Sequence, residues 1–338
     1  MMRSYITQIQ HGENLSHDAI AVVMELIMSG HASMDEIKEF LLALNKKGPT
    51  VDEITACALM MRKFVVPVNT KHRVILDTCG TGGDQSGTFN ISTISAIVVA
   101  SCGVVVAKHG NRSISSKCGS ADVLEALGVN LNMEERHLNE CLDTVGLAFL
   151  FAQRLHPAMK NVAPARKELG VKTIFNILGP LTNPAQATHQ VMGVYSRDLV
   201  EPMVRVLKNL GLKRALVVHG NDGLDEITTT DKTFVSEYNG SEIISYDINP
   251  DELGVARVSL SDLAGGDAKQ NASIALDILE GQAGPKRNIV VVNAAYALYT
   301  AQTVDNFAQG LRMAEHAIDS RRALDKLEEL KEFTNCVR

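Results

Sequence analysis

The residues with the clearest chemical potential lie in a glycine-rich segment after a short apolar run. The segment is Asp77-Thr-Cys-Gly-Thr-Gly-Gly-Asp84; Val74-Ile-Leu76 precedes it, and a helix-like run begins near Ser92. Glycines let a backbone approach a ligand closely and point its N–H groups inward. A helix N-terminus adds partial positive charge. The order of strand, glycine turn and helix start therefore predicts a phosphate site.

The spacing of these glycines excludes two common phosphate motifs. No Gly-Lys-Ser/Thr follows, as a P-loop requires, and the charged Asp84 stands where the dinucleotide fingerprint needs a small residue. Taken alone, the pattern is equally consistent with a plain tight turn. The basic, hydroxyl-rich segment that comes next along the chain favours the phosphate interpretation.

That basic segment is Lys108-His-Gly-Asn-Arg-Ser-Ile-Ser-Ser116, and we expect it to form a loop after a strand at Val104–Ala107. Its two cations can neutralise phosphate and its serines can donate hydrogen bonds to phosphate oxygens. A solvated polar loop is the alternative. Gly119-Ser-Ala-Asp122 then opens a helix, with Ser120 or Asp122 at the cap, a role compatible with a phosphate contact.

Two adjacent carboxylates, Asp225 and Glu226, follow a predicted strand at Ala215–His219. Ligands of open α/β sheets bind beyond the carboxyl ends of the strands. Paired carboxylates there suit Mg²⁺ shared with substrate phosphates, and a charged turn is the alternative. We expect both residues to lie in a solvent-facing loop.

A third region could bind an acidic acceptor. It runs from His156 to Arg166, and the planar guanidinium of Arg166 could clamp a carboxylate. A surface salt bridge is the alternative. Asn176, a polar residue in an apolar helix, favours a structural role.

Composition narrows the class of protein. The chain has 338 residues, 45% of them hydrophobic, a formal net charge of −6 and no tryptophan. That size allows two domains, and the charge and scarce aromatics argue against nucleic-acid binding. Six cysteines without a Cys-x-x-Cys pair predict reduced thiols in a cytoplasmic protein. We expect no signal peptide and no membrane span.

The order of predicted elements indicates an α/β fold with a small helical N-terminal domain. Residues 1–70 read as short amphipathic helices, with capping boxes at Ser33 and Thr50. From residue 71 to residue 338, apolar runs alternate with helical patterns, which predicts a mostly parallel sheet flanked by helices. Asn239-Gly240 predicts a hairpin within Thr233–Asp247. The stretch Ile289–Leu298 is ambiguous between strand and helix.

In these motifs the chain closely resembles the anthranilate phosphoribosyltransferases. The resemblance runs through nearly the whole length and rests on several segments in order. They are Gly80-Thr-Gly-Gly-Asp84, Thr88-Phe-Asn-Ile-Ser-Thr93, Lys108-His-Gly-Asn-Arg112, Gly119-Ser-Ala-Asp122, His156-Pro-Ala-Met159, Thr173-Ile-Phe-Asn-Ile-Leu-Gly-Pro-Leu181 and Gly223-Leu-Asp-Glu226.

The resemblance implies Mg²⁺-dependent transfer of phosphoribosyl from phosphoribosyl pyrophosphate to anthranilate, a tryptophan-pathway step. It also implies that helices from about residues 165–185 join the N-terminal helical domain. A homodimer formed through the helical parts is implied as well, with no nucleic-acid or membrane partner. By this resemblance, phosphoribosyl pyrophosphate is held by Gly80, Gly83, Asp84, Thr88, Asn90, Ile91, Ser92, Thr93, Lys108, His109, Gly110, Asn111, Arg112, Ser113, Ile114, Ser115, Ser116 and Ser120. Anthranilate is held by Gly80, Asn111, His156 and Arg166, and metal by Ser92, Asp225 and Glu226.

The departures from the family pattern remove no charged or phosphate-facing group. They are Gln85, Cys118, Gln153 and Ala165, in place of glycine, serine, proline and valine. Two alternatives stay open. One is a pyrimidine nucleoside phosphorylase, against which Arg166 and the glycine loop argue. The other is an inert paralogue with a regulatory or nucleic-acid-binding role. Because the anthranilate amine is already neutral, we assign no catalytic acid or base, and expect charge stabilisation by Lys108 and metal.

Overall fold

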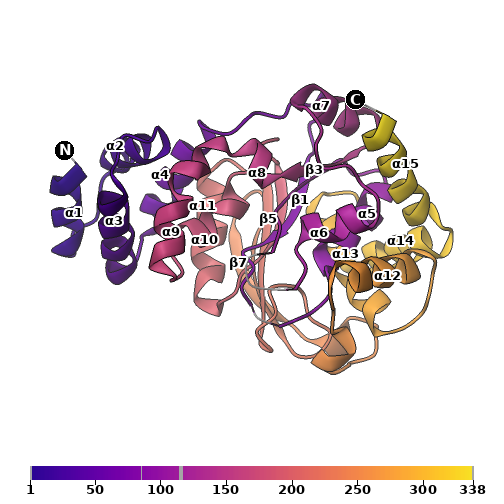
Figure 1. Cartoon of the computed structure of the whole chain (residues 1–338). Coiled ribbons are helices and arrows are strands. Elements are labelled where there is room, and N and C mark those ends of the chain that lie inside the picture. Colours follow the sequence, from indigo (N-terminus) through magenta and orange to yellow (C-terminus); the bar gives the residue numbers. More distant parts are fainter. Residues whose placement is uncertain (1, 85, 114–116, 337–338) are drawn as a thin grey trace.

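A seven-stranded sheet stands at the centre of the molecule, between helices on both faces (Figure 1). The computed structural model describes residues 2–84, 86–113 and 117–336. The strand order is β3-β2-β1-β4-β5-β6-β7. The strands are β1 (Leu76–Gly80), β2 (Val106–Gly110), β3 (Leu147–Phe151), β4 (His189–Gly193), β5 (Arg214–Gly220), β6 (Thr233–Tyr238) and β7 (Ile243–Ile248).

The first five strands are mutually parallel, and the last two add an antiparallel edge. This confirms the expected mostly parallel sheet. The hairpin predicted from Asn239-Gly240 is β6–β7, in which Tyr238 pairs with Ile243. The tight turn follows from the positive φ of Gly240, 100°.

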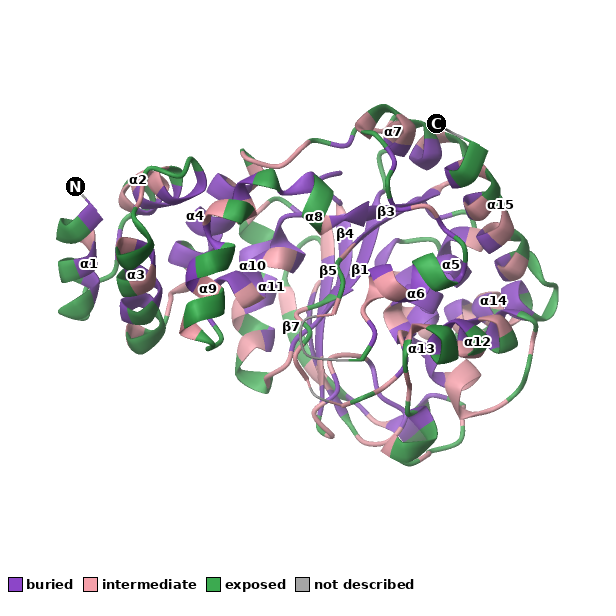
Figure 2. Ribbon diagram, in the orientation of Figure 1, coloured by how far each residue is buried: buried purple, intermediate pink, exposed green. Residues whose placement is uncertain are grey.

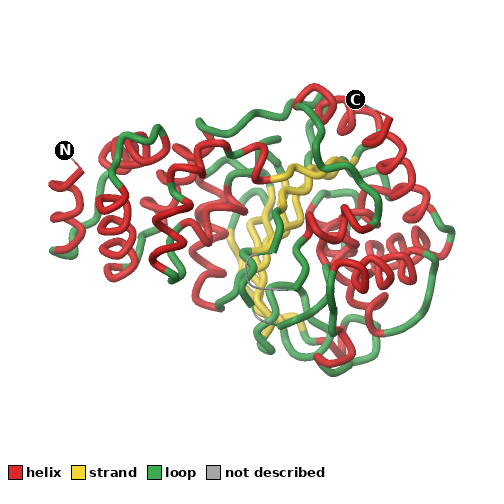
Figure 3. The backbone as a smooth tube through the Cα atoms, in the orientation of Figure 1, coloured by secondary structure: helices red, strands yellow, loops and turns green. Residues whose placement is uncertain are grey.

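Helices make up most of the rest of the described chain (Figure 3). They are α1 (Met2–Gln10), α2 (His17–Met28), α3 (Met34–Lys47), α4 (Val51–Arg62), α5 (Ile91–Ser101), α6 (Ser120–Ala126), α7 (Glu135–Thr144), α8 (Ala152–Leu155), α9 (Ala163–Leu169), α10 (Phe175–Leu178), α11 (Val200–Asn209), α12 (Ala268–Leu279), α13 (Pro285–Thr300), α14 (Phe307–Asp319) and α15 (Arg322–Cys336). Short 3₁₀ turns are η1 (Pro157–Asn161), η2 (Gly179–Leu181), η3 (Arg197–Leu199), η4 (Pro250–Glu252) and η5 (Leu260–Leu263).

Local signals account for several helix boundaries. The capping boxes predicted at Ser33 and Thr50 are present at the starts of α3 and α4. Asp122 closes a similar box at α6, because its carboxylate accepts from the N–H of Gly119. The ambiguous Ile289–Leu298 stretch lies inside α13, whose apolar side chains are buried all round.

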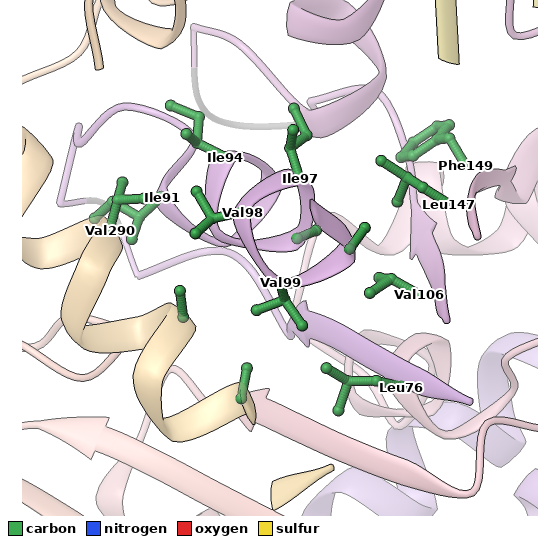
Figure 4. Close-up of a cluster of buried hydrophobic side chains, with 14 of the residues drawn as sticks. Leu76, Ile91, Ile94, Ile97, Val98, Val99, Val106, Leu147, Phe149 and Val290 are labelled. Atoms are coloured by element: carbon green, nitrogen blue, oxygen red, sulfur yellow. The ribbon is translucent and has the colours of Figure 1, made fainter. Parts of the chain in front are cut away.

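Two apolar clusters lie on opposite faces of the sheet. One surrounds α5 and α13, where Ile94, Ile97 and Val290 pack near Leu76 and Val106 (Figure 4). The other joins α1–α4 to α9, α10, α11 and one face of β5. The burial colouring shows the sheet and the inward helix faces enclosed (Figure 2). A domain boundary at residue 70 remains a prediction, since this second cluster continues from the N-terminal helices onto the sheet.

The strands differ from the predicted positions in two important places. We expected strands at Val74–Leu76 and Val104–Ala107, with loops after them, but β1 and β2 continue to Gly80 and Gly110. Lys108 is therefore a buried strand residue and not part of a polar loop. Polar side chains within these strands find buried partners, which hydropathy alone cannot foresee.

The thiols and the helices agree with two further expectations. Cys57, Cys79, Cys118 and Cys141 are buried, and neither Cys102 nor Cys336 forms a disulfide. Among the helices of the described chain, none combines the length and the apolar character that a membrane crossing requires.

Candidate active site

The site lies at the carboxyl ends of β1 and β4, where the topology opens a crevice. The chain leaves β1 through α5 on one face of the sheet and leaves β4 through α11 on the other (Figure 1). Connections that diverge in this way leave room for a ligand at the ends of the two strands. Gly80 and Gly193, the last residues of these strands, pair directly.

Both glycines allow the Asp225 segment to lie over this edge. A Cβ atom at Gly193 would stand 1.6 Å from the backbone oxygen of Asp225, and one at Gly80 would stand 2.5 Å from its Oδ2. Sequence reasoning identified Gly80 but missed Gly193. A glycine inside the apolar run Val191–Val194 was the available signal, because strand glycines often mark a close backbone approach.

The carboxylates of this segment hold the predicted phosphate-binding motifs together. Asp225 accepts a hydrogen bond from the N–H of Gly82 at 3.1 Å, and Glu226 accepts from the N–H of Ser92 at 3.1 Å. The first contact fixes the glycine loop, and the second lies in the first turn of α5. Both residues lie in a loop, as expected, but they are half-buried and not fully open to solvent.

The electrostatics of this cluster favour a bound cation. Burial and nearby Asp84 raise the pKa of Asp225 to about 7, while burial and Asp225 raise the pKa of Glu226 to about 8. Carboxylate oxygens in such a cluster are the ligands that Mg²⁺ prefers. Within the described ranges, however, no three acidic, His or Cys side chains form a ready metal cage. Substrate oxygens would have to complete the coordination.

Lys108 supplies a buried cation beside these carboxylates. Its ammonium donates to the carbonyl of Thr78 and to Oγ of Ser92, the latter at 3.3 Å. Burial lowers the pKa of Lys108, while Asp77 and, more weakly, Glu226 and Asp225 oppose that shift. The amine is thus held at the inner wall of the site, next to two of the predicted metal ligands.

A second group of predicted residues surrounds the start of α6. Ser120 Oγ donates to the carbonyl of Asn111 at 3.2 Å, and a Cβ at Gly110 would stand 2.3 Å from that hydroxyl. The Arg112 guanidinium already pairs with Asp122 at 3.0 Å and donates to Glu125 at 2.8 Å. A phosphate contact by Arg112 therefore requires exchange with these carboxylates and stays a prediction.

Asn90 connects the end of the glycine loop to elements far along the chain. Its amide donates to the carbonyl of Cys118 at 3.2 Å and accepts from Asn271 at 2.9 Å. Asn271, on α12, was missed because nothing in its neighbourhood resembles a motif. Ile91 and Thr93 are buried in the first turn of α5, and Thr88 bridges to Ala264.

One predicted acceptor-binding residue, His156, contacts a histidine of the sheet, His109 on β2. Nε2 of His156 lies 3.0 Å from Nε2 of His109, and both side chains are buried. Burial lowers the pKa of His156 to about 4 and that of His109 well below its usual range. Both rings are therefore neutral at pH 7. His109 also bonds the carbonyl of Gly179, so its other nitrogen accepts from His156.

Arg166 is available for an anionic ligand. It is half-buried, its guanidinium carbon lies 5.7 Å from the Phe175 ring centroid, and burial lowers its pKa. Across residues 2–84, 86–113 and 117–336, no carboxylate lies within ion-pairing distance of its guanidinium, which disfavours the surface salt bridge. No hydrogen bond in these ranges joins Arg166 to Asn111, so their shared role stays a prediction.

The remaining predicted residues are placed as follows. Gly83 and Asp84 lie in the glycine loop, half-exposed, and Ser113 lies at the end of the described part of the β2–α6 loop. Ile114, Ser115 and Ser116, as well as the departure Gln85, lie outside the described residues. Asn176 has the structural role expected, because its Oδ1 accepts from the N–H of Thr173 at 2.8 Å.

Comparisons with known proteins agree with this fold and site. The α/β domain of a glycosyl transferase family matches residues 72–324, and the helical bundle domain of a glycosyl transferase family matches residues 3–65. Together they define a glycosyl transferase with a helical bundle and an α/β domain.

Relatives narrow the class further. The chain is 51% identical to the anthranilate phosphoribosyltransferase of Clostridium kluyveri, covering 99% of this chain and 100% of that protein. It is 49% identical to that of Petrotoga mobilis, over 99% of this chain and 97% of that protein. The chain belongs to the anthranilate phosphoribosyltransferase family.

Solved structures show the same architecture. The Thermus thermophilus enzyme matches with a TM-score of 0.93 at 40% identity, covering 98% of this chain and 99% of that one. The Saccharomyces cerevisiae enzyme in complex with PRPP and Mg matches with a TM-score of 0.92 at 27% identity, covering 99% and 98%.

Proposed function

We propose that this protein transfers the phosphoribosyl group of phosphoribosyl pyrophosphate to the amine of anthranilate, releasing pyrophosphate. The observation that carries the proposal is the double anchoring of the Asp225-Glu226 segment, to the glycine loop at Gly82 and to α5 at Ser92. It joins the carboxylate pair that we propose to bind metal to the loop that we propose to bind phosphate. The full-length identity to anthranilate phosphoribosyltransferases supports the choice of substrates.

The donor would lie along the carboxyl edge of β1 and β4. The glycine-loop N–H groups and Lys108 would stabilise negative charge on the departing pyrophosphate. Asp225, Glu226 and Ser92 would hold Mg²⁺, whose charge would favour departure of that group. Lys108 is bonded to Ser92 beside these ligands, where the nearby carboxylates oppose the lowering of its pKa by burial.

The acceptor would be oriented by its carboxylate. Arg166 can clamp that group, and the neutral His156 can line the approach without repelling a neutral amine. The anthranilate amine is already nucleophilic at pH 7, so no general base is needed before attack on the ribose C1. Nucleophile and leaving group on opposite sides of C1 give inversion. Positioning supplies the rest of the acceleration.

Assembly and location complete the proposal. We infer a homodimer formed through the N-terminal helices, which is supported by the exposed Met34 and Leu42 on α3. A cytoplasmic location is supported by the cysteines, none of which forms a disulfide in the described part of the chain.

Anthranilate fluorescence tests the activity directly. We expect the signal to fall when protein, phosphoribosyl pyrophosphate and Mg²⁺ are mixed with anthranilate, with pyrophosphate released in equal amount. Omission of either the donor or the metal should prevent the loss. Phosphorolysis of uridine or thymidine in place of this reaction would instead identify a pyrimidine nucleoside phosphorylase. An absence of both reactions would contradict the proposal.

A further inference from the structure

Lys172 connects the glycine loop to the segment between α9 and α10. Its ammonium donates to the carbonyl of Gly83 at 3.3 Å and stands 3.5 Å from the centroid of the Tyr195 ring. Cation–π contacts of this kind favour a cation held over the aromatic face. The described residues offer no carboxylate within ion-pairing distance of Lys172, so these two contacts define its position.

Both sides of this contact are themselves anchored. The carbonyl of Lys172 accepts from the amide of Asn45 on α3 at 2.8 Å. The N–H of Tyr195 donates to Oγ1 of Thr81 at 3.0 Å, and the N–H of Thr81 donates to the carbonyl of Gly193 at 2.9 Å. The glycine loop is therefore connected to α3 through Lys172 and to the end of β4 through Thr81.

The contact between Lys172 and the Gly83 carbonyl fixes the direction of the next backbone N–H, that of Asp84. In a trans peptide the C=O and the next N–H point to opposite sides. With the Gly83 carbonyl turned to Lys172, the N–H of Asp84 faces away from the lysine. Among the described residues, no acceptor bonds to the N–H of Gly83 or to that of Asp84. Gly82 and Gly83 both have positive φ, 64° and 75°, a backbone conformation that glycine adopts at little cost.

We propose that Lys172 is a positioning residue that orients the Gly83–Asp84 peptide so that its N–H binds the pyrophosphate group of the donor. This inference rests on the proposed function. Lys172 acts through the loop and through its charge at the rim of the site, and is not itself a catalytic residue.

The test compares Lys172→Met, which keeps the length of the side chain, with Lys172→Arg. We expect Lys172→Met to weaken binding of pyrophosphate with Mg²⁺ about tenfold by calorimetry, in line with loss of a charged hydrogen bond. The kcat/KM for phosphoribosyl pyrophosphate should fall by a similar factor, with the KM for anthranilate unchanged. Lys172→Arg should keep most of the pyrophosphate affinity and most of the kcat/KM, because a guanidinium can make the same two contacts. Lys167→Met, an exposed lysine on α9, is the matched control.

The outcomes separate this inference from the proposed function. Absence of turnover by the parent protein rejects the function, while the pyrophosphate titration still tests Lys172. Equal pyrophosphate affinity in parent and Lys172→Met overturns the positioning role. A lower melting temperature with equal losses for both substrates and no rescue by arginine overturns it too, because that pattern indicates a purely structural residue.

Discussion

At the scale of single residues, the site depends on polar groups whose partners are distant in sequence. Asp77 is buried within β1, yet its carboxylate accepts from Asn183 at 2.8 Å and from the N–H of His109 at 3.1 Å. The sequence singled out the carboxylate pair Asp225 and Glu226 from residue type and place, and their metal-binding role stays a prediction. It could not predict Asn183, because an asparagine satisfied by a buried carboxylate has no local pattern.

Arg166→Ala should weaken anthranilate binding far more than donor binding. A lost contact to a carboxylate is worth about 2–4 kcal/mol, or roughly 30- to 1,000-fold in affinity. Calorimetry on each substrate separately measures the effect. Arg154→Ala, which removes an exposed arginine from α8, is the control. An equal loss of both affinities would indicate that Arg166 is structural.

Changing Asp225 and Glu226 together to Asn and Gln should remove most activity, by about a hundredfold or more, because fixed metal charge supplies several kcal/mol of stabilisation. The fold should persist without loss of melting temperature, since the change removes repulsion between crowded carboxylates. Activity against Mg²⁺ concentration and a thermal melt provide the two measurements. Normal turnover at ordinary Mg²⁺ would reject the metal assignment.

At the scale of elements, the strand ends explain both the successes and the errors of prediction. Hydropathy predicted the five parallel strands, because their apolar centres are distinctive. The predicted strands are Val74–Leu76, Val104–Ala107, Ala148–Phe151, Val191–Val194 and Ala215–His219. Hydropathy ended β1 and β2 too early, because Asp77, Thr78 and Lys108 resemble loop residues until their buried partners are known. The local structure predicted for the candidate site residues at these ends was therefore wrong, while their binding roles stay predictions.

Gly83→Val should abolish donor binding with modest loss of stability. A Cβ at Gly83 would meet Lys172 only at ordinary contact distance, 3.6 Å, so the cost comes from its φ of 75°, about 1–3 kcal/mol for a β-branched residue. Phosphoribosyl pyrophosphate with Mg²⁺ should raise the melting temperature of the parent by ligand linkage. The variant should show little rise. An undiminished rise would mean that this loop does not hold the phosphates.

The His109–His156 contact between β2 and the segment after α8 should make stability depend on pH. Burial lowers the pKa of His156 to about 4, against about 6.5 in an unfolded chain. Its contribution is therefore complete above pH 6.5 and is lost as the pH falls toward 4, by on the order of 3 kcal/mol. Urea unfolding at pH 7.5 and pH 5 measures this slope, and His156→Gln should flatten it. An unchanged slope would assign the dependence to other groups.

At the scale of the whole molecule, the helical layer and the sheet share an apolar cluster that includes residues of α1–α4 and Val217 of β5. The sequence predicted a separate N-terminal domain from the change in periodicity near residue 70. Periodicity reports which face of a helix is apolar, but not what covers it. The extent of this shared cluster was therefore outside the reach of the sequence.

The proposed dimer places the exposed face of α3 at an interface. Leu42→Glu should convert a particle of about twice 36.6 kDa into one of about 36.6 kDa, because a charge at an apolar interface costs several kcal/mol. Light scattering coupled to gel filtration gives the mass. Val74→Glu, at an exposed valine outside the helical layer, should leave the mass unchanged. If the parent protein is already a monomer, or if Leu42→Glu is still a dimer, the proposed interface is rejected.

The contact between Gly193 and Asp225 has a consequence for how mutational tolerance is interpreted in this family. The space beside Gly193 is taken by a backbone oxygen, 1.6 Å from any added Cβ, and not by a ligand. In a saturation screen, position 193 should be as intolerant when selection is for folding alone as when it is for turnover. Selection for a new acceptor could change the half-buried Arg166, yet it would inherit this glycine unchanged.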